Sequence, residues 1–317
     1  MKILVIGLGA LGTVYSCLLS LAGHEVTGLS RPASIVKIKQ DGVKVTGIWG
    51  EHSTKLWNVA SDVSELLHET FDMIIVTVKS FLTEEIARQL APLVGENTFV
   101  FLLQNGYGNF EATAQSIAEH KIVVGRVIFG AETLATGESR VTVIADDVMI
   151  GSPKNLIPPE LLEEFADVFR QALVPTKASL EIMNYIWGKI IYNSALNSLG
   201  AIFEVNYGTL AQEPVTRDLM NKMIGEIFDL LRVSNVPTFF PNAQSYLANF
   251  YEHLVPPTAA HHSSMLQDIR SGRRTEIDAL NGAVVQLAHQ AGSPVPVNEV
   301  IAAMVKAKEN LTRKTGK

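Results

Sequence analysis

The sequence is poor in cysteine, in uninterrupted apolar runs and in clustered positive charge. Its 317 residues include one cysteine, Cys17, so no disulfide can form within the chain and a reducing compartment is expected. No stretch reaches the roughly 18 consecutive apolar residues of a membrane-spanning helix. Lysine and arginine number 26 against 32 acidic residues, without a basic tract, which argues against nucleic acid as a partner. These absences favour a cytoplasmic protein with neither a membrane nor a nucleic-acid partner.

The chain does contain enough apolar sequence for two packed domains. Hydrophobic residues make up 47% of it and charged residues 18%, which is typical of a globular protein. Strand and helix patterns alternate through the first half, and from Ser179 onward the patterns are helical. We therefore predict an α/β domain over residues 1–176 and an all-helical domain over residues 177–317.

A glycine-rich turn follows the first predicted strand, residues 2–6. Its sequence is Gly7-Leu8-Gly9-Ala10-Leu11-Gly12, and an apolar helix is predicted over residues 10–21. A lone G-x-G-x-x-G is weak evidence, but within a strand–turn–helix–strand unit it indicates dinucleotide binding. The first glycine allows the tight turn, the second lets the backbone approach a pyrophosphate, and the third lets the helix pack on the strand. The helix N-terminus then offers N–H groups and partial positive charge to the phosphates.

The end of the second predicted strand, residues 25–29, distinguishes the two nicotinamide cofactors. NAD enzymes usually carry Asp or Glu there to bond the ribose 2′-hydroxyl. Here Ser30 and Arg31 follow the strand with no acid. The arginine fork can pair with a 2′-phosphate and the serine can donate to it, which favours NADP(H). The alternative is that Arg31 is an ordinary surface arginine.

Two further strand ends carry polar residues. Lys79 follows a predicted strand over residues 71–78, and Asn105 follows one over residues 98–103. Ligands of open α/β sheets bind beyond the carboxyl ends of the strands. We therefore expect Lys79 near the cofactor phosphates and Asn105 near the nicotinamide and the substrate. For Asn105 and its following glycine, an ordinary turn pair is the alternative.

Other elements follow from periodicity and turn residues. In the first half these are a hairpin over residues 41–59, a strand over 121–125, β-like runs at 139–144 and 148–150, and a helix over 158–173. In the second half the predicted helices cover residues 180–199, 214–234, 241–252, 259–269, 276–290 and 296–309.

The first helix of the second half carries three polar residues among apolar neighbours. Lys189, Asn193 and Asn197 recur every four residues, so they share one face of a helix with 3.6 residues per turn. One cation with two amides suits a pocket that holds and protonates a small polar anion. The alternative is a solvated polar face.

A second polar stretch, residues 261–278, lies between apolar segments. Ser264 begins a set of polar residues at helical spacing, and Thr275 is expected to cap the next helix. Glu276 would lie in the first turn of that helix, where negative charge suits the dipole, and this role alone could explain it. No metal site is expected at His261-His262, because neighbouring helical residues point apart and no third ligand has suitable spacing.

Over nearly its whole length the chain resembles the ketopantoate reductase (2-dehydropantoate 2-reductase) family. The resemblance implies a Rossmann-type α/β domain followed by an all-α domain of the 6-phosphogluconate-dehydrogenase-like kind, with the active site in the cleft between them. It implies NADPH-dependent reduction of ketopantoate, a 2-oxo acid, to (R)-pantoate in pantothenate biosynthesis. The motifs that carry the resemblance are the N-terminal G-x-G-A-x-G, the arginine after the second strand, Val78-Lys79-Ser80, Gln104-Asn105-Gly106, the lysine–asparagine helix, and Ser263-Ser264-Met-x-Gln-Asp followed by Thr275-Glu276-Ile-Asp278.

The resemblance also implies roles for individual residues. Lys189 matches the catalytic acid and Glu276 the residue that assists it. A backbone contact to the nicotinamide is expected in a loop around Ala131-Glu132-Thr133, where the family varies. The full set implied for the cofactor is Gly7, Leu8, Gly9, Ala10, Leu11, Gly12, Ser30, Arg31, Lys79, Asn105, Thr133 and Glu276, and that for the substrate is Asn105, Lys189, Asn193, Asn197, Asn206 and Ser264.

Other functions are compatible with the sequence. A reductase of a different 2-oxo acid, or an opine-type dehydrogenase, would use related architecture. A third possibility is a protein that is not an enzyme but an NADP(H)-binding sensor. The set of Lys189, Ser264 and Glu276 argues against a sensor, because a sensor does not need a proton donor beside the nicotinamide. The oligomeric state is not fixed by sequence, although the apolar helices after Pro214 would suit a homodimer through the helical domain.

Overall fold

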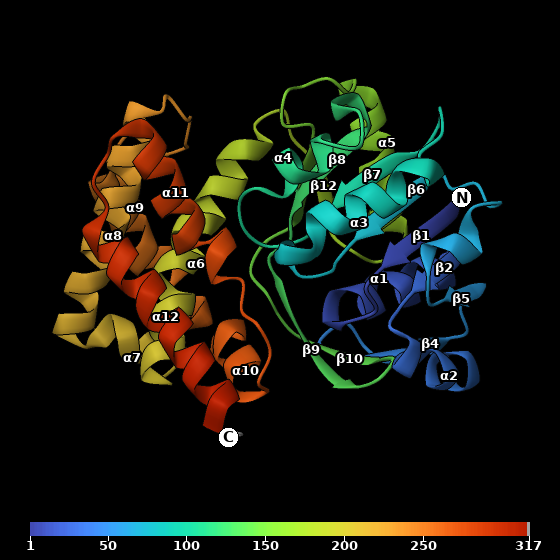
Figure 1. Cartoon of the computed structure of the whole chain (residues 1–317), viewed down its shortest axis with the longest axis horizontal. Helices are drawn as coiled ribbons and strands as arrows, with labels where there is room; N and C mark the ends of the chain where they lie inside the picture. The colour runs from blue at the N-terminus through green and yellow to red at the C-terminus, as the bar shows by residue number, and fades with distance from the viewer. Residues whose placement is uncertain (316–317) are drawn as a thin grey trace. The chain divides into compact units, whose positions relative to one another are not determined.

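The computed structural model describes residues 1–315 and divides the chain into two compact units. The first comprises Met1–Gln104 and Asn109–Ile182; the second comprises Asn105–Gly108 and the chain from Met183 onward. Figure 1 shows the strands in the first unit and the helices from α6 onward in the second. The division after Ile182 differs from the predicted one after residue 176, because the short strand that begins at Thr176 pairs with the sheet of the first unit.

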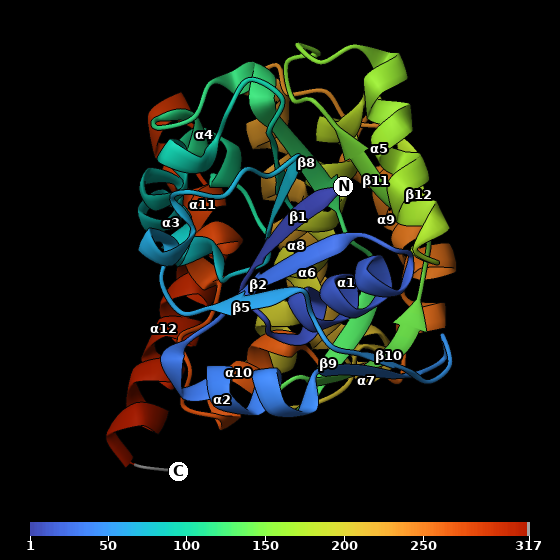
Figure 2. The ribbon, with the colours of Figure 1, turned by 90° about the vertical axis from the view of Figure 1, so that its right-hand side faces the viewer.

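The first unit is built on a large, mostly parallel sheet. Within residues 1–315 this sheet has eight strands, and all neighbouring pairs run parallel except β11 with β8. Strand β1 lies between β2 and β6, so the chain leaves β1 on one side and returns on the other; Figure 2 shows β1, β2 and β5 side by side. Such a switch point is where open α/β sheets bind ligands. The spatial order is β12 (Thr176–Ala178), β11 (Val148–Gly151), β8 (Ile122–Arg126), β7 (Phe99–Leu102), β6 (Met73–Val76), β1 (Lys2–Ile6), β2 (Glu25–Leu29) and β5 (Asn58–Ala60).

Helix α1 (Ala10–Leu21) packs against strands of the large sheet and of a second, smaller sheet. Two layers cover it, so most of its residues are buried, and the ring of Tyr15 meets that of Phe169 edge-on at 5.6 Å. Cys17 is fully buried, and burial raises the pKa of its thiol to about 11, so it stays protonated at neutral pH. The remaining helices of this unit are α2 (Pro32–Asp41), α3 (Thr83–Leu90), α4 (Asn109–Ala114) and α5 (Pro159–Gln171).

The smaller sheet has the spatial order β4–β3–β10–β9. The predicted hairpin is present as β3 (Val43–Gly47) and β4 (His52–Thr54), and β10 (Glu138–Ile144) pairs in parallel with β3. Strand β9 (Phe129–Ala135) corrects the prediction of a loop around residues 131–133. Its sequence has little β-branched or alternating character, so antiparallel pairing with β10, rather than local propensity, makes it a strand.

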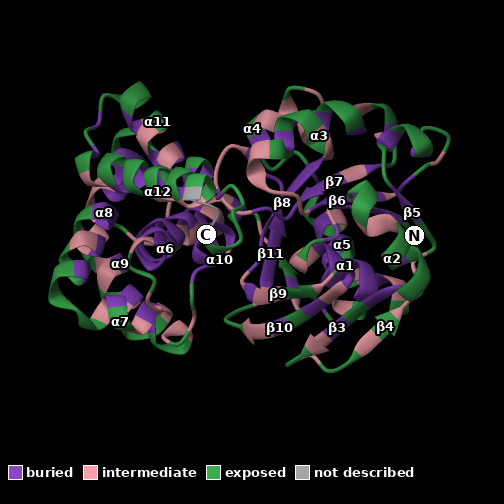
Figure 3. Cartoon of the chain, turned by 60° about the horizontal axis from the view of Figure 1, so that its bottom comes forward, coloured by how far each residue is buried: buried purple, intermediate pink, exposed green. Residues whose placement is uncertain are grey.

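The second unit packs its helices around α6 (Ile182–Phe203), which Figure 3 colours mostly as buried. One core joins apolar side chains of α6 to those of α8 and α11. No helix within residues 1–315 has the length and apolar character needed to cross a membrane. The other helices of this unit are α7 (Tyr207–Gln212), α8 (Pro214–Val233), α9 (Ala243–Asn249), α10 (Ser264–Arg270), α11 (Asn281–Ala291) and α12 (Pro296–Thr315).

The helix boundaries differ from prediction where local caps intervene. Helix α10 begins at Ser264 rather than at residue 259, because the hydroxyl of Ser263 accepts a hydrogen bond from the N–H of Leu266 at 3.0 Å. The helix predicted over residues 276–290 is interrupted: a 3₁₀ turn (Ile277–Ala279) precedes α11. Helix α7 was not predicted, and α9 continues into a π-helical turn, Phe250–Leu254.

Candidate active site

The turn after β1 contains close approaches that exclude side chains at two glycines. Gly7 has φ of +91°, and a Cβ there would lie 2.7 Å from Cγ1 of Val78. A Cβ on Gly12 would lie 2.0 Å from the carbonyl oxygen of Gly7, so any side chain there would push α1 away from β1. A Cβ on Gly9 would meet no atom within 4 Å. The turn is therefore closed at its two ends and open at its middle glycine.

This turn fits the phosphates of a dinucleotide. Gly9 is the N-cap of α1 and Ala10 its first residue, and the first N–H groups of a helix have no partner inside the helix. No acidic residue lies in the first turn of α1, so no carboxylate there repels a phosphate. Leu8 and Leu11 point to the apolar side, where both pack with the core of this unit.

The residues predicted for the adenosine end lie at the carboxyl ends of strands next to β1. Ser30 follows β2, and its N–H donates to Ala60 at 3.1 Å. Arg31 is exposed as the N-cap residue of α2. Lys79 follows β6, one residue after Val78, which lies against the glycine turn. The structure thus brings these segments to the same edge of the sheet.

Thr133, predicted for the nicotinamide, lies in an edge strand of the smaller sheet. It is exposed in β9 and pairs with Ser139 of β10. The prediction that Thr133 lies in a loop is wrong, because pairing with β10 makes this segment a strand. The contact of Thr133 with the nicotinamide stays a prediction.

The loop that follows β7 belongs to the helical unit. The N–H of Tyr107 donates to the carbonyl of Ala279 at 2.8 Å, and the Tyr107 and Trp187 rings lie 5.3 Å apart. Gly106 has φ of +88°, and a Cβ there would lie 2.5 Å from the carbonyl oxygen of Ala279. This close approach requires glycine, and it carries Asn105 into the second unit.

Asn105 connects Lys189 to Glu276. The ammonium of Lys189 donates to Oδ1 of Asn105 at 2.7 Å, and Nδ2 of Asn105 makes a longer and weaker hydrogen bond to Oε2 of Glu276, at 3.5 Å. The cation and the anion together orient the amide between them, with its oxygen toward the lysine. Glu276 is 8% exposed and Lys189 is half-buried. The arrangement fixes an ammonium group that can give a proton to a neighbouring oxygen.

Asn193 and Asn197 continue the polar face of α6. They are 7% and 6% exposed, so they do not form a solvated polar face. Four residues correspond to about 6 Å along a helix, so the amides form a row leading away from Lys189. Buried amides that face a site offer both donors and acceptors to a small polar ligand.

Ser264 lies near the far end of this row. It is exposed as the first residue of α10. Its neighbour Ser263 packs against α6: a Cβ on Gly200 would lie 3.3 Å from Cβ of Ser263. Gly200 is about one turn beyond Asn197, so the segment that carries Ser264 reaches the same end of α6.

Asn206 has a local role, and its neighbour makes the contact with α6. Oδ1 of Asn206 caps α7 by accepting from the N–H of Thr209 at 2.9 Å. The hydroxyl of Tyr207 donates to Oδ1 of Asn197. Sequence reasoning missed Tyr207, because nothing in its local pattern separates it from an ordinary core aromatic.

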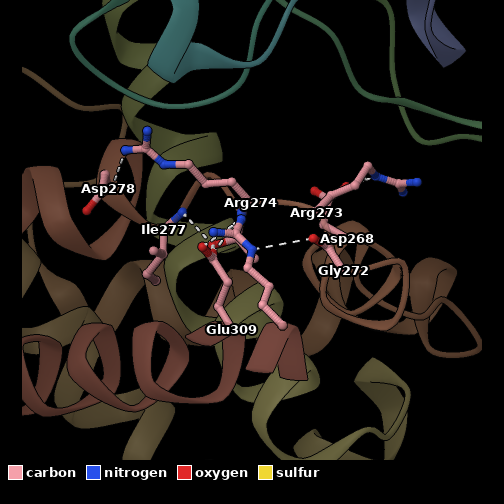
Figure 4. A network of polar contacts seen from close by, with 9 residues as sticks. Asp268, Gly272, Arg273, Arg274, Ile277, Asp278 and Glu309 are labelled. Carbon is pink, nitrogen blue, oxygen red and sulfur yellow. Dashed lines mark hydrogen bonds and ion pairs between the residues drawn. The ribbon is translucent and has the colours of Figure 1, made fainter. Parts of the chain in front are cut away.

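The segment before Glu276 is anchored to α12, as Figure 4 shows from close by. The N–H and the hydroxyl of Thr275 both donate to Oε2 of Glu309 at 2.8 Å. Thr275 is 1% exposed and Glu309 is 8% exposed, so this is a buried, charge-assisted contact. Thr275 was expected to cap the next helix, but its contact to the N–H of Ile277 is long, at 3.4 Å. Its main partner is the carboxylate.

Asp278, just beyond Glu276, is held by two cations. Partial burial would raise the pKa of its carboxyl, but the bonds from Lys306 and Arg274 outweigh burial and hold that pKa below its usual range. Among residues 1–315, no group of three or more His, Cys, Asp or Glu side chains is placed to hold a metal ion.

Two family models match this chain. The model described as ketopantoate reductase PanE/ApbA matches residues 3–155, and the model of that family's C-terminal domain matches residues 181–309. A 2-dehydropantoate 2-reductase of Aquifex aeolicus is 45% identical over 311 residues, covering 98% of this chain and 97% of that protein. The chain belongs to the ketopantoate reductase family.

Further members of the family are similar over their full length. The 2-dehydropantoate 2-reductase of Pyrococcus abyssi is 30% identical, covering 99% of this chain and 100% of that protein. The crystal structure of a ketopantoate reductase from Ralstonia eutropha JMP134 has a TM-score of 0.87 at 28% identity, covering 99% of this chain and 100% of that one. These relatives confirm the predicted α/β Rossmann-type domain followed by a helical domain.

A solved structure that does not carry the name ketopantoate reductase has the same fold. D-mandelate dehydrogenase, solved with NADH and anilino(oxo)acetate, has a TM-score of 0.89 and covers 98% of this chain and 99% of its own. It is 23% identical, so this likeness concerns the fold alone.

Proposed function

We propose that this protein reduces 2-dehydropantoate to (R)-pantoate with NADPH, the activity that names its relative from Aquifex aeolicus. The observation that carries the proposal is the hydrogen-bonded series from Lys189 through Asn105 to Glu276. It fixes a proton donor beside buried amides on a chain that belongs to this family.

The cofactor would be held mainly by the first unit. The open face of Gly9 and the N-terminus of α1 suit the pyrophosphate, with Lys79 nearby. Ser30 and Arg31 suit a 2′-phosphate, and no acid stands there to favour the hydroxyl of NAD. A backbone contact from Thr133 and a polar contact from Glu276 complete the set. When bound, the reduced nicotinamide supplies the hydride.

Lys189 acts as the general acid. As the ketone is reduced, negative charge develops on its oxygen, and a donor placed there stabilises the transition state more than the ground state. A lysine ammonium is ordinarily charged at neutral pH and can give up its proton as the alkoxide forms. A charge-assisted hydrogen bond to Asn105 holds the ammonium in place, and Glu276 acts on it through the amide of Asn105.

The substrate is held by the polar residues beyond Lys189. Asn193 and Asn197 suit its hydroxyl and carbonyl groups, and Ser264 suits its carboxylate. Asn206 remains in this set, with its amide nitrogen as the contacting group because its oxygen caps α7.

The test is an assay of NADPH oxidation with 2-dehydropantoate. The loss of NADPH absorbance gives the rate, and detection of pantoate identifies the product. Turnover with NADPH, and much less with NADH, is expected. Benzoylformate and pyruvate are assayed in parallel, each alone and with an amino acid. Reduction of one of these but not of 2-dehydropantoate would support a different 2-oxo acid reductase or an opine-type dehydrogenase, in keeping with the fold shared with D-mandelate dehydrogenase. NADPH binding without turnover of any oxo acid would support a sensor.

We also propose a cytoplasmic location and a homodimer through the helical domain. The single buried cysteine suits a reducing compartment. Exposed apolar side chains on α8 and α12, among them Val215 at 67%, Val300 at 59% and Leu311 at 62%, suit a subunit contact. Light scattering in solution tests the dimer, and a monomeric mass at micromolar concentration would exclude it.

A further inference from the structure

Tyr207 contacts the substrate-binding face of α6 without belonging to that helix. Its hydroxyl donates to Oδ1 of Asn197, and the two residues are 3% and 6% exposed. A side-chain amide has one acceptor atom, its oxygen, and one donor group, its NH2. Because the phenol occupies the oxygen, the NH2 group is directed away from Tyr207.

The phenol of Tyr207 keeps its proton at neutral pH. Burial raises the pKa of Tyr207 well above its usual value, and the neighbouring phenol of Tyr192 acts in the same direction. A neutral phenol has a proton to donate, and here it donates to the amide oxygen of Asn197.

The ring of Tyr207 is fixed from several sides. It meets the ring of Tyr192 at 6.0 Å and that of His261 at 5.3 Å, both edge-on. The backbone N–H of Tyr207 donates to the carbonyl of His261 at 3.1 Å. The ring also lies beside α6, since a Cβ on Gly200 would be in ordinary van der Waals contact with Cε1 of Tyr207, at 3.5 Å. The hydroxyl therefore has a defined position against α6.

We infer that Tyr207 is a positioning residue for the substrate: it fixes the Asn197 amide so that the NH2 group is presented to an oxygen acceptor of the 2-oxo acid. The inference rests on the proposed function and adds the hydrogen-bonding polarity of that site. Asn197 lies two helical turns, about 12 Å along the axis, from Lys189, so this donor serves the end of the substrate remote from the proton transfer. Without Tyr207 the amide can turn its oxygen toward the substrate and repel the same group.

The experiment begins with Tyr207→Phe, which keeps the ring and removes the donor. We expect KM for 2-dehydropantoate to rise about tenfold, the usual scale for losing one hydrogen bond, with kcat changed less than about threefold and NADPH affinity unchanged. The matched control is Tyr251→Phe. Tyr251 also donates to an asparagine oxygen, Oδ1 of Asn221 at 2.8 Å, and burial raises its pKa to about 12. The control variant should keep the wild-type KM.

A double-mutant cycle separates positioning from general loosening. If Tyr207 acts through Asn197, then Tyr207→Phe raises KM no further when Asn197→Ala is already present. A Tyr207→Phe variant with the KM of Tyr251→Phe, or an equal increase with and without Asn197, would overturn the inference while leaving the proposed function intact. A wild-type protein that reduces no 2-oxo acid overturns both.

Two further measurements complete the test. If Tyr207→Phe does not fold, Asn197→Asp replaces it: the carboxylate still accepts from Tyr207 but cannot donate, so KM should rise as in Asn197→Ala. A wild-type KM for Asn197→Asp would overturn the inference. Comparing 2-dehydropantoate with 3,3-dimethyl-2-oxobutanoate, which lacks only the terminal hydroxyl, identifies the acceptor. An effect of Tyr207→Phe confined to 2-dehydropantoate assigns the hydroxyl oxygen, and an equal effect on both assigns the carboxylate.

Discussion

The glycine turn after β1 and the polar face of α6 are built in opposite ways. The turn depends on atoms that are absent: a Cβ on Gly12 would lie 2.0 Å from a backbone oxygen, and Gly9 leaves open space. The α6 face depends on atoms that are present, because Lys189 has its position through Asn105 and Glu276. Added atoms should therefore damage the turn, and removed atoms should damage the face. The Lys189 and glycine variants test this contrast directly, and the Arg31 and Glu309 variants extend it to residues that lie outside the turn and the α6 face.

The largest effect is expected for Lys189→Ala. Removing the proton donor should lower kcat about 10²- to 10⁴-fold, the usual contribution of positioned proton transfer, while NADPH binding is largely kept. Steady-state kinetics and NADPH titration measure the two quantities. Lys222→Ala is the control, since Lys222 is an exposed lysine of the same unit paired with Asp218 at 2.7 Å. Turnover above about a tenth of wild type would refute the role of Lys189.

The next effect compares alanine at two glycines of the turn. Gly12→Ala should destabilise the protein by about 1–3 kcal/mol through overpacking and abolish NADPH binding. Gly9→Ala should leave the melting temperature unchanged, because its Cβ meets no atom within 4 Å, and still weaken NADPH binding about tenfold or more. Thermal unfolding and NADPH titration separate the two. Equal losses of stability would break the distinction between the closed and the open positions.

A smaller, cofactor-specific effect is expected for Arg31→Ala. Losing charge-assisted bonds to the 2′-phosphate should weaken NADPH binding about tenfold or more, with NADH binding unchanged. Lys37→Ala removes a cation from the same helix, one that pairs with Asp41 at 2.7 Å, and controls for general charge. Affinities for both cofactors are measured at one salt concentration. If NADPH binding barely changes, the NADP assignment is wrong.

The smallest effect on activity is expected for Glu309→Gln. The buried carboxylate receives two hydrogen bonds from Thr275, so its neutralisation should cost about 1–3 kcal/mol of unfolding free energy. Turnover should fall severalfold if this anchor positions Glu276. Glu299→Gln, an exposed position of α12 paired with His289 at 2.9 Å, is the control. Lower stability in urea with wild-type turnover would limit Glu309 to a role in folding.

The local sequence pattern predicted the helices, strands and turns that neighbouring residues specify by themselves. Helix α1 has the predicted bounds, and Gly7 and Gly12 have the predicted geometry, because turn, strand and helix are adjacent in the chain. Strand β9 and helix α7 were not predicted. Strand β9 is ordered by its pairing with β10. Helix α7 begins at the N-cap residue Asn206, and a capping asparagine before so short a helix cannot be told from an ordinary polar turn in the sequence.

The sequence by itself determined the dinucleotide turn, the polar row on α6 and the chemical types of the site residues, because these follow from backbone periodicity and side-chain identity. Only the tertiary structure decided which residues meet. Asn105 lies 84 residues before Lys189 and 171 before Glu276, and it reaches them because Gly106 lets its loop pack against Ala279. Tyr207, rather than Asn206, contacts Asn197 because the oxygen of Asn206 caps α7 while the Tyr207 hydroxyl donates to α6. Such contacts depend on where distant segments pack, and no local pattern encodes them.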